Sequence, residues 1–269
     1  MNDEDARVPT AVNLALPQIV AAIDAIARRM EQGGRLIYVG AGTPGRIGVL
    51  DASEWPPTFG TSPEQIFAII AGGTQAIWSS LEGAEDDELA GAAAIDLARV
   101  GVLDSVVGIA SSGRTPYVLA SVRRARALGA LTVGLSCNEA TELSSLVEHP
   151  IEVLVGAEIV SGSTRLKAGT AQKLVLNMVS TIVNVQLGKT YGNLMVDLSA
   201  NNAKLRGRAV GIVQAVTGIT MERARATLES TGYRVKEAIV VLRLAVTPED
   251  AANRLAAHSG RLRRVLDEA

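Results

Sequence analysis

Short aliphatic runs alternate along most of the chain with segments that carry apolar residues at helical spacing. Runs rich in Val, Ile and Leu are typical of strands that are buried on both faces of a parallel sheet. Their alternation with helices predicts an α/β fold, a three-layer α-β-α domain with a five-stranded parallel sheet. The predicted strands are Leu36–Val39, Ile66–Ile70, Val106–Ala110, Leu131–Ser136 and Ile151–Val155, and helical spacing is clearest in Ala11–Arg29, Leu89–Val100 and Tyr117–Leu128.

The pattern changes after the fifth run, and from Lys167 onward the sequence predicts only helices. Three of them are short and amphipathic, and they resemble a small unit of the ubiquitin-associated type. Thr220 is a suitable N-cap for the first of the three. We expect an α/β domain with an N-terminal helix over residues 1–205 and a helical subdomain over residues 206–269, either a packing appendage or a separate binding module. The three short helices lie near Met221–Ser230, Arg234–Leu244 and Pro248–His258.

Composition and charge narrow the class of protein. A net charge of −2 without a basic block offers no electrostatic footprint for nucleic acid. The single cysteine, Cys137, excludes an internal disulfide, and two distant histidines make a metal site implausible. Met1–Asp5 is acidic, unlike a signal peptide, and the apolar helix near Leu174–Leu187 is too polar to cross a bilayer. We expect a cytoplasmic protein without a metal, a membrane or a nucleic-acid partner.

A glycine-rich segment follows the first predicted strand and opens a helix from Gly45 onward. Its spacing over Gly40–Arg46 satisfies G-x-G-x-x-G, in which glycines let backbone N–H groups approach a phosphate. Dinucleotide-binding proteins also place a carboxylate at the end of the second strand. Here Ile66–Ile70 leads into Ala71–Thr74, which has none. The loop therefore favours a phosphorylated small molecule over NAD, and we expect no cofactor.

Two further polar loops follow predicted strands. Ser111–Thr115 comes after the third strand and leads into a helix, where hydroxyls, N–H groups and the charge of Arg114 suit a phosphate monoester. Glu158–Lys167 comes after the fifth strand and opens a long buried helix. Both segments are also consistent with plain N-caps. Because ligands bind at the carboxyl ends of parallel strands, we expect Ser111–Thr115 to bind a ligand.

Two carboxylates stand near the ends of predicted helices. Glu85 introduces a helix, where acidic residues usually compensate the helix dipole. Glu54 closes the preceding helix, because Trp55 and two prolines come next. A carboxylate at a helix C-terminus opposes the dipole, so Glu54 calls for another explanation.

Several segments together resemble the N-acetylmuramic acid 6-phosphate etherases, sugar isomerase (SIS) domain enzymes related to the glucokinase regulatory protein. The resemblance runs end to end and implies cleavage of the lactyl ether of N-acetylmuramate 6-phosphate in peptidoglycan recycling, without metal or nucleotide. One departure is Pro44, where the family usually has serine. The matching strings are Gly40–Glu54, Glu82–Asp86, Ser111–Tyr117, Gly162–Lys173 and Gly192–Asp197.

The resemblance also implies roles for individual residues. Glu54 matches the acid toward the departing lactate, and Glu85 matches the second catalytic carboxylate, assigned as the base. The other positions are expected to bind the phosphate and sugar. They are Gly42, Thr43, Gly45, Ser111, Ser112, Gly113, Arg114, Thr115, Glu158 and Lys167.

Two alternatives share the fold, a sugar-phosphate isomerase and a non-enzymatic sugar-phosphate sensor. The isomerase reaction has no leaving group and needs no Glu54, and the glucokinase regulatory protein lacks the Asp-Ala-Ser-Glu string. A helix from Gly45 to Glu54 rises about 1.5 Å per residue, so Glu54 lies on the order of 15 Å from the glycine-rich turn. Glu54 and the glycine-rich loop of one chain are therefore too far apart to contact the same substrate molecule. We therefore expect a homodimer with sites at its interface, as is common in SIS proteins.

Overall fold

The structure is a computed structural model that describes residues 1–268. The chain forms two compact units, which are described separately. The first unit comprises Met1–Ser53 and Pro63–Val183, and the second comprises Glu54–Ser62 and the chain from Asn184 onward. The division expected from the sequence, after residue 205, stays a prediction.

The first unit is built on a five-stranded sheet with helices before, between and after its strands. The strands are β1 (Leu36–Gly40), β2 (Ile66–Ile70), β3 (Ser105–Ile109), β4 (Leu131–Ser136) and β5 (His149–Glu152). The helices are α1 (Asn2–Asp5), α2 (Val8–Leu14), α3 (Leu16–Glu31), α4 (Gly42–Phe59), α5 (Gln75–Trp78), η1 (Ala84–Asp86), α6 (Glu88–Leu97), α7 (Pro116–Ala127), α8 (Glu142–Leu146) and α9 (Lys167–Gln186). Helices α4 and α9 each continue into the second unit.

All neighbouring strands of this sheet pair in parallel, in the order β2-β1-β3-β4-β5. This confirms the predicted five-stranded parallel sheet. The strand that differs most from its prediction is β5, which pairs over His149–Glu152 and stops short of the predicted Val155. Apolar content alone does not mark where pairing ends, and Val153 and Val155 are buried outside the ladder.

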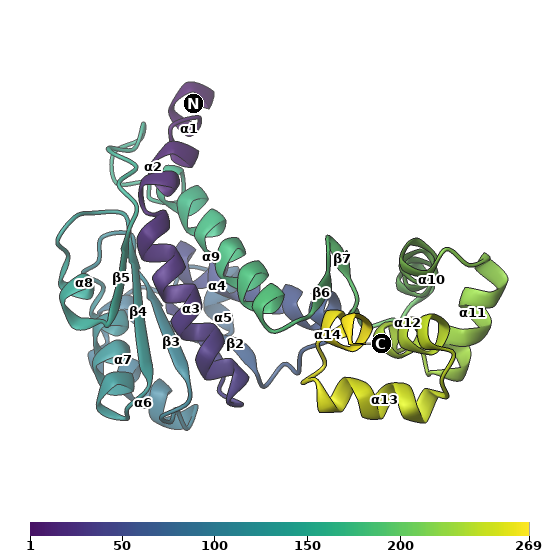
Figure 1. Cartoon of the computed structure of the whole chain (residues 1–269). Helices are drawn as coiled ribbons and strands as arrows, with labels where there is room; N and C mark the ends of the chain where they lie inside the picture. The colour runs from purple at the N-terminus through teal and green to yellow at the C-terminus, as the bar shows by residue number, and fades with distance from the viewer. Residues whose placement is uncertain (269) are drawn as a thin grey trace. The chain divides into compact units, whose positions relative to one another are not determined.

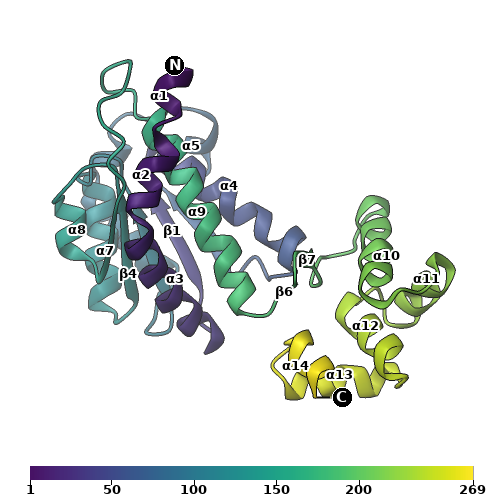
Figure 2. The same ribbon diagram turned by 45° about the horizontal axis from the view of Figure 1, so that its top comes forward.

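Helices cover both faces of the sheet, and the two sides of β1 show how (Figures 1 and 2). Ile37 and Val39 point to one face, where they pack with Ile95 of α6 and Tyr117 of α7. Tyr38 points to the opposite face, because side chains alternate along a strand. A Cβ added to Gly48 of α4 would lie 3.1 Å from the Tyr38 Cβ, so α4 packs directly on this face. The predicted α-β-α layering is therefore confirmed.

The predicted N-terminal helix over Ala11–Arg29 is two helices rather than one. Helix α2 ends at Leu14, and the axis from Asn2–Leu14 to Leu16–Glu31 bends by 60°. Pro17 lies in the first turn of α3 and has no N–H to donate to the preceding turn. Pro17 therefore starts a second helix within the segment that was predicted to be one continuous helix.

Helix α4 differs from its prediction at both ends. It begins at Gly42, whose φ is +57°, rather than at Gly45, and it runs through Pro56 and Pro57 to Phe59 instead of stopping at Glu54. Two adjacent prolines remove intrahelical hydrogen bonds and usually end a helix. Here Trp55 and Phe59, one turn apart and both buried, stack edge to face with ring centroids 6.3 Å apart. This packing holds the final turn in the second unit.

A buried carboxylate joins three elements of the first unit. Asp51 of α4 accepts a hydrogen bond from the Tyr38 hydroxyl of β1 at 2.9 Å and one from the Ser180 hydroxyl of α9 at 3.0 Å. Tyr38 is fully buried, and burial together with the neighbouring Asp51 raises the pKa of its hydroxyl well above the usual value. The phenol therefore stays protonated and donates to the carboxylate.

The second unit is mainly helical, with a short antiparallel hairpin. The hairpin was missed by the sequence analysis, which predicted only helices beyond Lys167. Its strands are two residues long, and Gly192, with φ +59°, lies in the two-residue turn. Such short strands carry too little periodicity to be recognised in a sequence. The elements are β6 (Thr190–Tyr191), β7 (Leu194–Met195), α10 (Ala203–Thr217), α11 (Met221–Ser230), α12 (Val235–Leu244), α13 (Pro248–Ala257) and α14 (Leu262–Asp267).

The three short helices predicted for this unit are present as α11, α12 and α13, and α10 and α14 pack against the same core. Thr220 is the N-cap of α11, as predicted, and its side chain accepts the N–H of Arg223. The core is aliphatic, with Leu228, Ile239 and Val240 fully buried. No single helix among the described residues is long and apolar enough to span a membrane, and one bent pair, Asn2–Leu14 with Leu16–Glu31, passes by length and composition only.

Replacing Asp51 by alanine should destabilise the first unit, because the buried Tyr38 and Ser180 hydroxyls both lose an acceptor. We expect the free energy of unfolding to fall by about 2–3 kcal/mol. The matched control is Asp96→Ala, which removes a half-exposed pair with Arg124 and should cost about 0–1 kcal/mol. Urea unfolding of both variants measures the difference, and an equal loss in the two would contradict the assigned role of Asp51.

Candidate functional site

The carboxyl ends of β1 and β3 meet at the point where the strand order reverses. In the order β2-β1-β3-β4-β5 the chain moves outward on one side of β1 and then on the other. Loops that leave adjacent parallel strands in opposite directions open a crevice, the usual ligand site of such sheets. The glycine-rich loop follows β1 and the Ser111–Thr115 loop follows β3, so the fold brings the two predicted loops to the same crevice.

The glycines after β1 have separate structural roles. A Cβ at Gly40 would lie 2.6 Å from the Gly45 nitrogen, and one at Gly45 would lie 2.6 Å from Cγ1 of Ile70. Both positions therefore require glycine so that the first turn of α4 can approach β1 and β2. Gly42 has open space around its Cα and is exposed. Its backbone is free to approach a ligand.

Glu85 and Gly42 line one cavity of about 300 Å³. Glu85 is exposed and lies in η1, the short turn before α6. Arg46 of α4 also lines this cavity, and its guanidinium donates to the carbonyls of Ile77 at 3.0 Å and Ser79 at 3.2 Å. Arg46 thereby ties the segment that leads to Glu85 to the helix that follows the glycine-rich loop.

Ser111 is held from three directions. Its carbonyl accepts from the Asn138 side chain at 2.9 Å and from the Cys137 N–H at 3.0 Å. Its hydroxyl accepts from the Gln172 amide of α9 at 2.8 Å. With that lone pair occupied, the Ser111 hydroxyl hydrogen is left to donate. Ser112 is exposed and accepts the Arg114 N–H at 3.2 Å.

The end of this loop leaves a helix N-terminus open. Gly113 has φ +65°, and a Cβ there would lie 2.3 Å from that of Thr141, so only glycine fits. Thr115 is the N-cap residue of α7, yet its side chain makes no capping hydrogen bond. A helix start without a cap, beside the exposed Arg114, is suited to an anion. This arrangement favours the ligand interpretation of the loop over the plain N-cap.

Glu158 and Lys167 have protein partners that account for both residues without a ligand. The Glu158 carboxylate accepts the N–H groups of Lys167 and Ala168, each at 3.0 Å, and caps α9. The Lys167 ammonium is buried and pairs with Glu4 at 2.5 Å. The N-cap interpretation left open for this segment is the one that the contacts favour, and a role in substrate binding stays a prediction. Thr43 lies near the same helix, its Cγ2 3.5 Å from a Cβ added at Gly169.

Glu54 is exposed on α4, and the helix continues for five more residues, to Phe59. The argument that it opposes the helix dipole at a C-terminus is therefore wrong, since the last turn lies beyond it. Its assignment now depends on the family resemblance. Glu54 belongs to the second unit and Glu85 to the first.

Two features of this region escaped the sequence analysis. Gln172 and Arg46 lie inside strings that carried the resemblance, but a single amide or guanidinium on a helix gives no signal of its own.

Cys137 is excluded as a nucleophile, because burial, with the nearby Glu158 charge, raises the pKa of its thiol to about 12. Among residues 1–268 no group of three potential metal-ligating side chains occurs.

Two family descriptions match separate parts of the chain. Residues 18–126 match the glucokinase regulatory protein N-terminal SIS domain, and residues 192–259 match the C-terminal lid domain of glucokinase regulatory protein. The fold of the chain is similar to a phosphoheptose isomerase from Francisella tularensis, with a TM-score of 0.53 at 18% identity over 68% of this chain and 96% of that one. A likeness at this identity shows the SIS fold alone.

Curated relatives are far more similar. An N-acetylmuramic acid 6-phosphate etherase of Rubrobacter xylanophilus is 59% identical over 97% of this chain and 87% of the relative. One of Streptomyces coelicolor is 55% identical over 99% of this chain and 86% of the relative. Because relatives that share more than half of its residues match nearly its whole length, this chain belongs to the N-acetylmuramic acid 6-phosphate etherase family.

Proposed function

We propose that this chain is a lyase that cleaves the lactyl ether of N-acetylmuramic acid 6-phosphate, releasing D-lactate and N-acetylglucosamine 6-phosphate in peptidoglycan recycling. The observation that carries the proposal is the identity of 59% and 55% to etherases over nearly the full chain. The crevice between β1 and β3 is flanked by the glycine-rich loop and by Ser111–Thr115. Both loops have features suited to binding phosphate, in keeping with a sugar-phosphate substrate.

The chemistry requires a base and an acid that act in turn. Opening of the sugar ring exposes an aldehyde, which acidifies the proton on carbon 2. A base removes that proton, lactate leaves from carbon 3 as its oxygen takes up a proton, and water adds back at carbon 3. Such steps need two groups positioned at different atoms of the substrate and held in different protonation states.

We assign Glu85 as the base and Glu54 as the acid. Glu85 shares its cavity with Gly42 of the glycine-rich loop, which supports a position beside a bound sugar phosphate. Arg46 donates hydrogen bonds to the carbonyls of Ile77 and Ser79 and thereby fixes the segment that leads to Glu85. Glu54 is exposed, so its carboxyl group is accessible to a substrate.

The phosphate is expected to lie against Ser111–Thr115. The uncapped start of α7, the Ser111 hydroxyl held by Gln172 and the exposed Arg114 together offer hydrogen-bond donors and positive charge. These are the groups that bind a phosphate monoester. Gly42, Thr43 and Gly45 would face the sugar from the other side of the crevice.

We propose that the active unit is a homodimer in which one subunit supplies the loops and its partner supplies Glu54. The continuity of α4 supports this. A break near Asp51 would let Glu54 fold back toward the glycine-rich loop of its own chain, but the helix is unbroken from Gly42 to Phe59. At about 1.5 Å per residue, the helical stretch from Gly42 to Glu54 is on the order of 18 Å long. The proposed compartment is the cytoplasm, with which the free, buried Cys137 is compatible.

Incubation with N-acetylmuramic acid 6-phosphate should release D-lactate, and its absence would overturn the proposed reaction. Glu54→Gln should lower lactate release by about 10²–10⁴-fold while exchange of the carbon 2 proton with deuterated solvent persists. Glu85→Gln should suppress both. Proton NMR of the substrate measures the exchange, and loss of exchange in Glu54→Gln would contradict its role as the acid.

Pro44→Ser should tighten substrate binding, because it restores the hydroxyl that the family usually carries in the first turn of α4. One regained hydrogen bond is worth about 1 kcal/mol, or about a fivefold lower KM. Pro44→Ala is the matched control, since it restores the N–H without the hydroxyl. An unchanged KM in Pro44→Ser would mean that the sugar phosphate does not contact this loop or that another group replaces the hydroxyl.

Mixing two inactive variants tests the shared site. Glu54→Gln and Arg114→Ala chains should each be inactive alone, and a heterodimer should regain one intact site if these residues come from different subunits. The heterodimer is expected to have about half the activity of the unmodified homodimer, since one of two sites is intact. Confirmed subunit exchange without any return of lactate release would contradict a site built across a dimer.

A further inference from the structure

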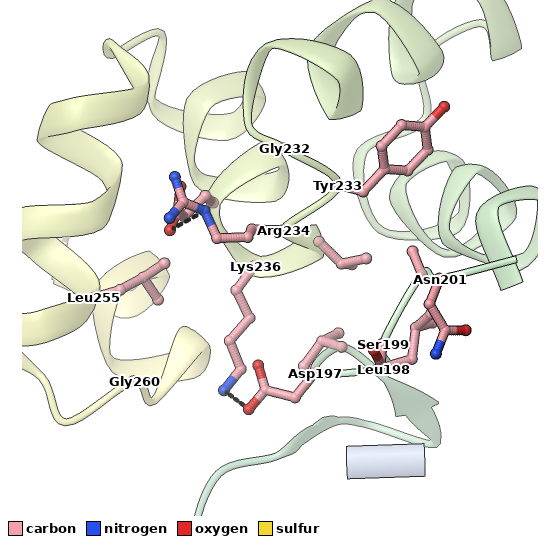
Figure 3. A pocket seen from close by; sticks show the side chains of 14 residues that line it. Asp197, Leu198, Ser199, Asn201, Gly232, Tyr233, Arg234, Lys236, Leu255 and Gly260 are labelled. Atoms are coloured by element: carbon pink, nitrogen blue, oxygen red, sulfur yellow. Dashed lines mark hydrogen bonds and ion pairs between the residues drawn. The ribbon is translucent and has the colours of Figure 1, made fainter. Parts of the chain in front are cut away.

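A cavity of about 540 Å³ is lined only by residues of the second unit, and none of the residues assigned above is among them. Its walls are the segment that follows β7, the start of α12, and two residues at and just after the C-terminal end of α13 (Figure 3). Four features of the cavity point to one kind of ligand, and none of them is explained by the proposed reaction.

The first feature is a buried ammonium group. Lys236 is only 8% exposed and pairs with Asp197 at 2.6 Å. Figure 3 shows its side chain reaching from α12 to Asp197, with Gly260 beside its charged end. A Cβ added at Gly260 would lie 3.8 Å from the Lys236 Nζ, so a side chain there would fill the space next to the ammonium.

The second feature is that Lys236 shares its carboxylate partner with another lysine. Asp197 also pairs with Lys189 at 3.3 Å, so one carboxylate serves two ammonium groups. Burial lowers the pKa of Lys236; Asp197 opposes this shift, and the charges of Lys189 and Arg261 add to it. Two ammonium groups therefore share the Asp197 carboxylate, and Lys236 is able to pair with a further anion.

The third feature is the start of α12, a helix of ten residues. Its N-cap residue is Arg234, which makes no side-chain capping bond and whose guanidinium has no acceptor to offer. Arg234, Val235 and Lys236 all line the cavity. The uncapped N–H groups and the positive end of the helix dipole therefore face the same space as the ammonium.

The fourth feature is a buried acceptor that has no partner. Glu237 is 8% exposed, and one of its oxygens accepts from Arg234 at 2.9 Å. Its other oxygen, Oε2, is buried and forms no hydrogen bond with any described residue. Burial raises the pKa of this carboxyl group, partly offset by Arg234. A buried acceptor without a donor costs stability, and a ligand donor would remove that cost.

We propose that this cavity is a second ligand site, which binds a hydroxylated anion up to the size of a sugar phosphate. The anionic group lies against Lys236 and the start of α12, and a hydroxyl or N–H of the ligand donates to the Glu237 Oε2. Two sources share this chemistry, a phosphorylated sugar and a hydroxy acid. The site does not depend on etherase activity, because no residue assigned to the reaction lines the cavity.

Calorimetric titration of the full chain tests the site with three probes, N-acetylglucosamine 6-phosphate, D-lactate and sulfate. Ser111→Ala with Arg114→Ala serves as the background, so that the crevice of the first unit does not contribute. At least one hydroxylated probe should still bind, and the stronger of the two identifies the source. Sulfate has an anionic group but no hydroxyl at neutral pH, and it should bind more weakly.

In that background, Lys236→Met should weaken binding of the hydroxylated probe and of sulfate by about tenfold or more. Lys204→Met is the matched control, an exposed lysine of α10 that does not line the cavity. Glu237→Met should weaken the hydroxylated probe and leave sulfate unchanged. It also keeps the test decisive if circular dichroism shows that Lys236→Met does not fold.

The proposal is wrong if none of the probes binds in the Ser111/Arg114 background. It is equally wrong if a probe binds there and neither Lys236→Met nor Glu237→Met changes its affinity. Lactate release by the unmodified chain is a separate readout. Failure of this second site therefore leaves the proposed reaction untouched, and the reverse also holds.

Discussion

The buried carboxylate of Asp51 is the interaction on which the first unit depends. It lies where strand β1 is covered by α4 and α9, and it accepts one hydrogen bond from the strand and one from α9. A buried carboxylate is tolerated only where donors surround it. The two donors must therefore reach it together, and this requirement fixes how α4 and α9 sit on β1. The glycine-rich loop connects that strand to that helix, so its geometry follows from the same contact.

The candidate crevice is built largely from backbone and from side chains held by other side chains. Gly40, Gly45 and Gly113 leave no room for a Cβ. Ser111 is oriented by Gln172 of a helix that begins 56 residues after it in the sequence. Glu54, Glu85 and Arg114 are exposed charged groups without such supporting roles. The site therefore separates rigid binding loops from a few accessible ionisable groups, as catalysis by positioned acids and bases requires.

The sequence predicted the sheet well because each strand is a short aliphatic run between helices, and burial on both faces demands that composition. The two loops were also predictable, since glycine and serine after a strand reflect backbone geometry. The passage of α4 through Pro56 and Pro57 was not predictable, because the packing of Trp55 on Phe59 outweighs a local preference. Glu158 was indistinguishable from a ligand-binding residue, since a carboxylate that caps a helix and one that holds a substrate look alike in a sequence.

The partner of the buried Lys167 ammonium is Glu4, 163 residues earlier in the chain. During synthesis the Glu4 carboxylate leaves the ribosome long before Lys167 is added. The ion pair therefore cannot form until the start of α9 has also been synthesised. A contact between such distant positions is among the slowest to form, because the loop that it closes spans more than half of the protein. Until α1 docks, an ammonium group destined for the interior has no counter-ion and must stay hydrated. The first turn of α9 is therefore among the last parts of the first unit to lose its water.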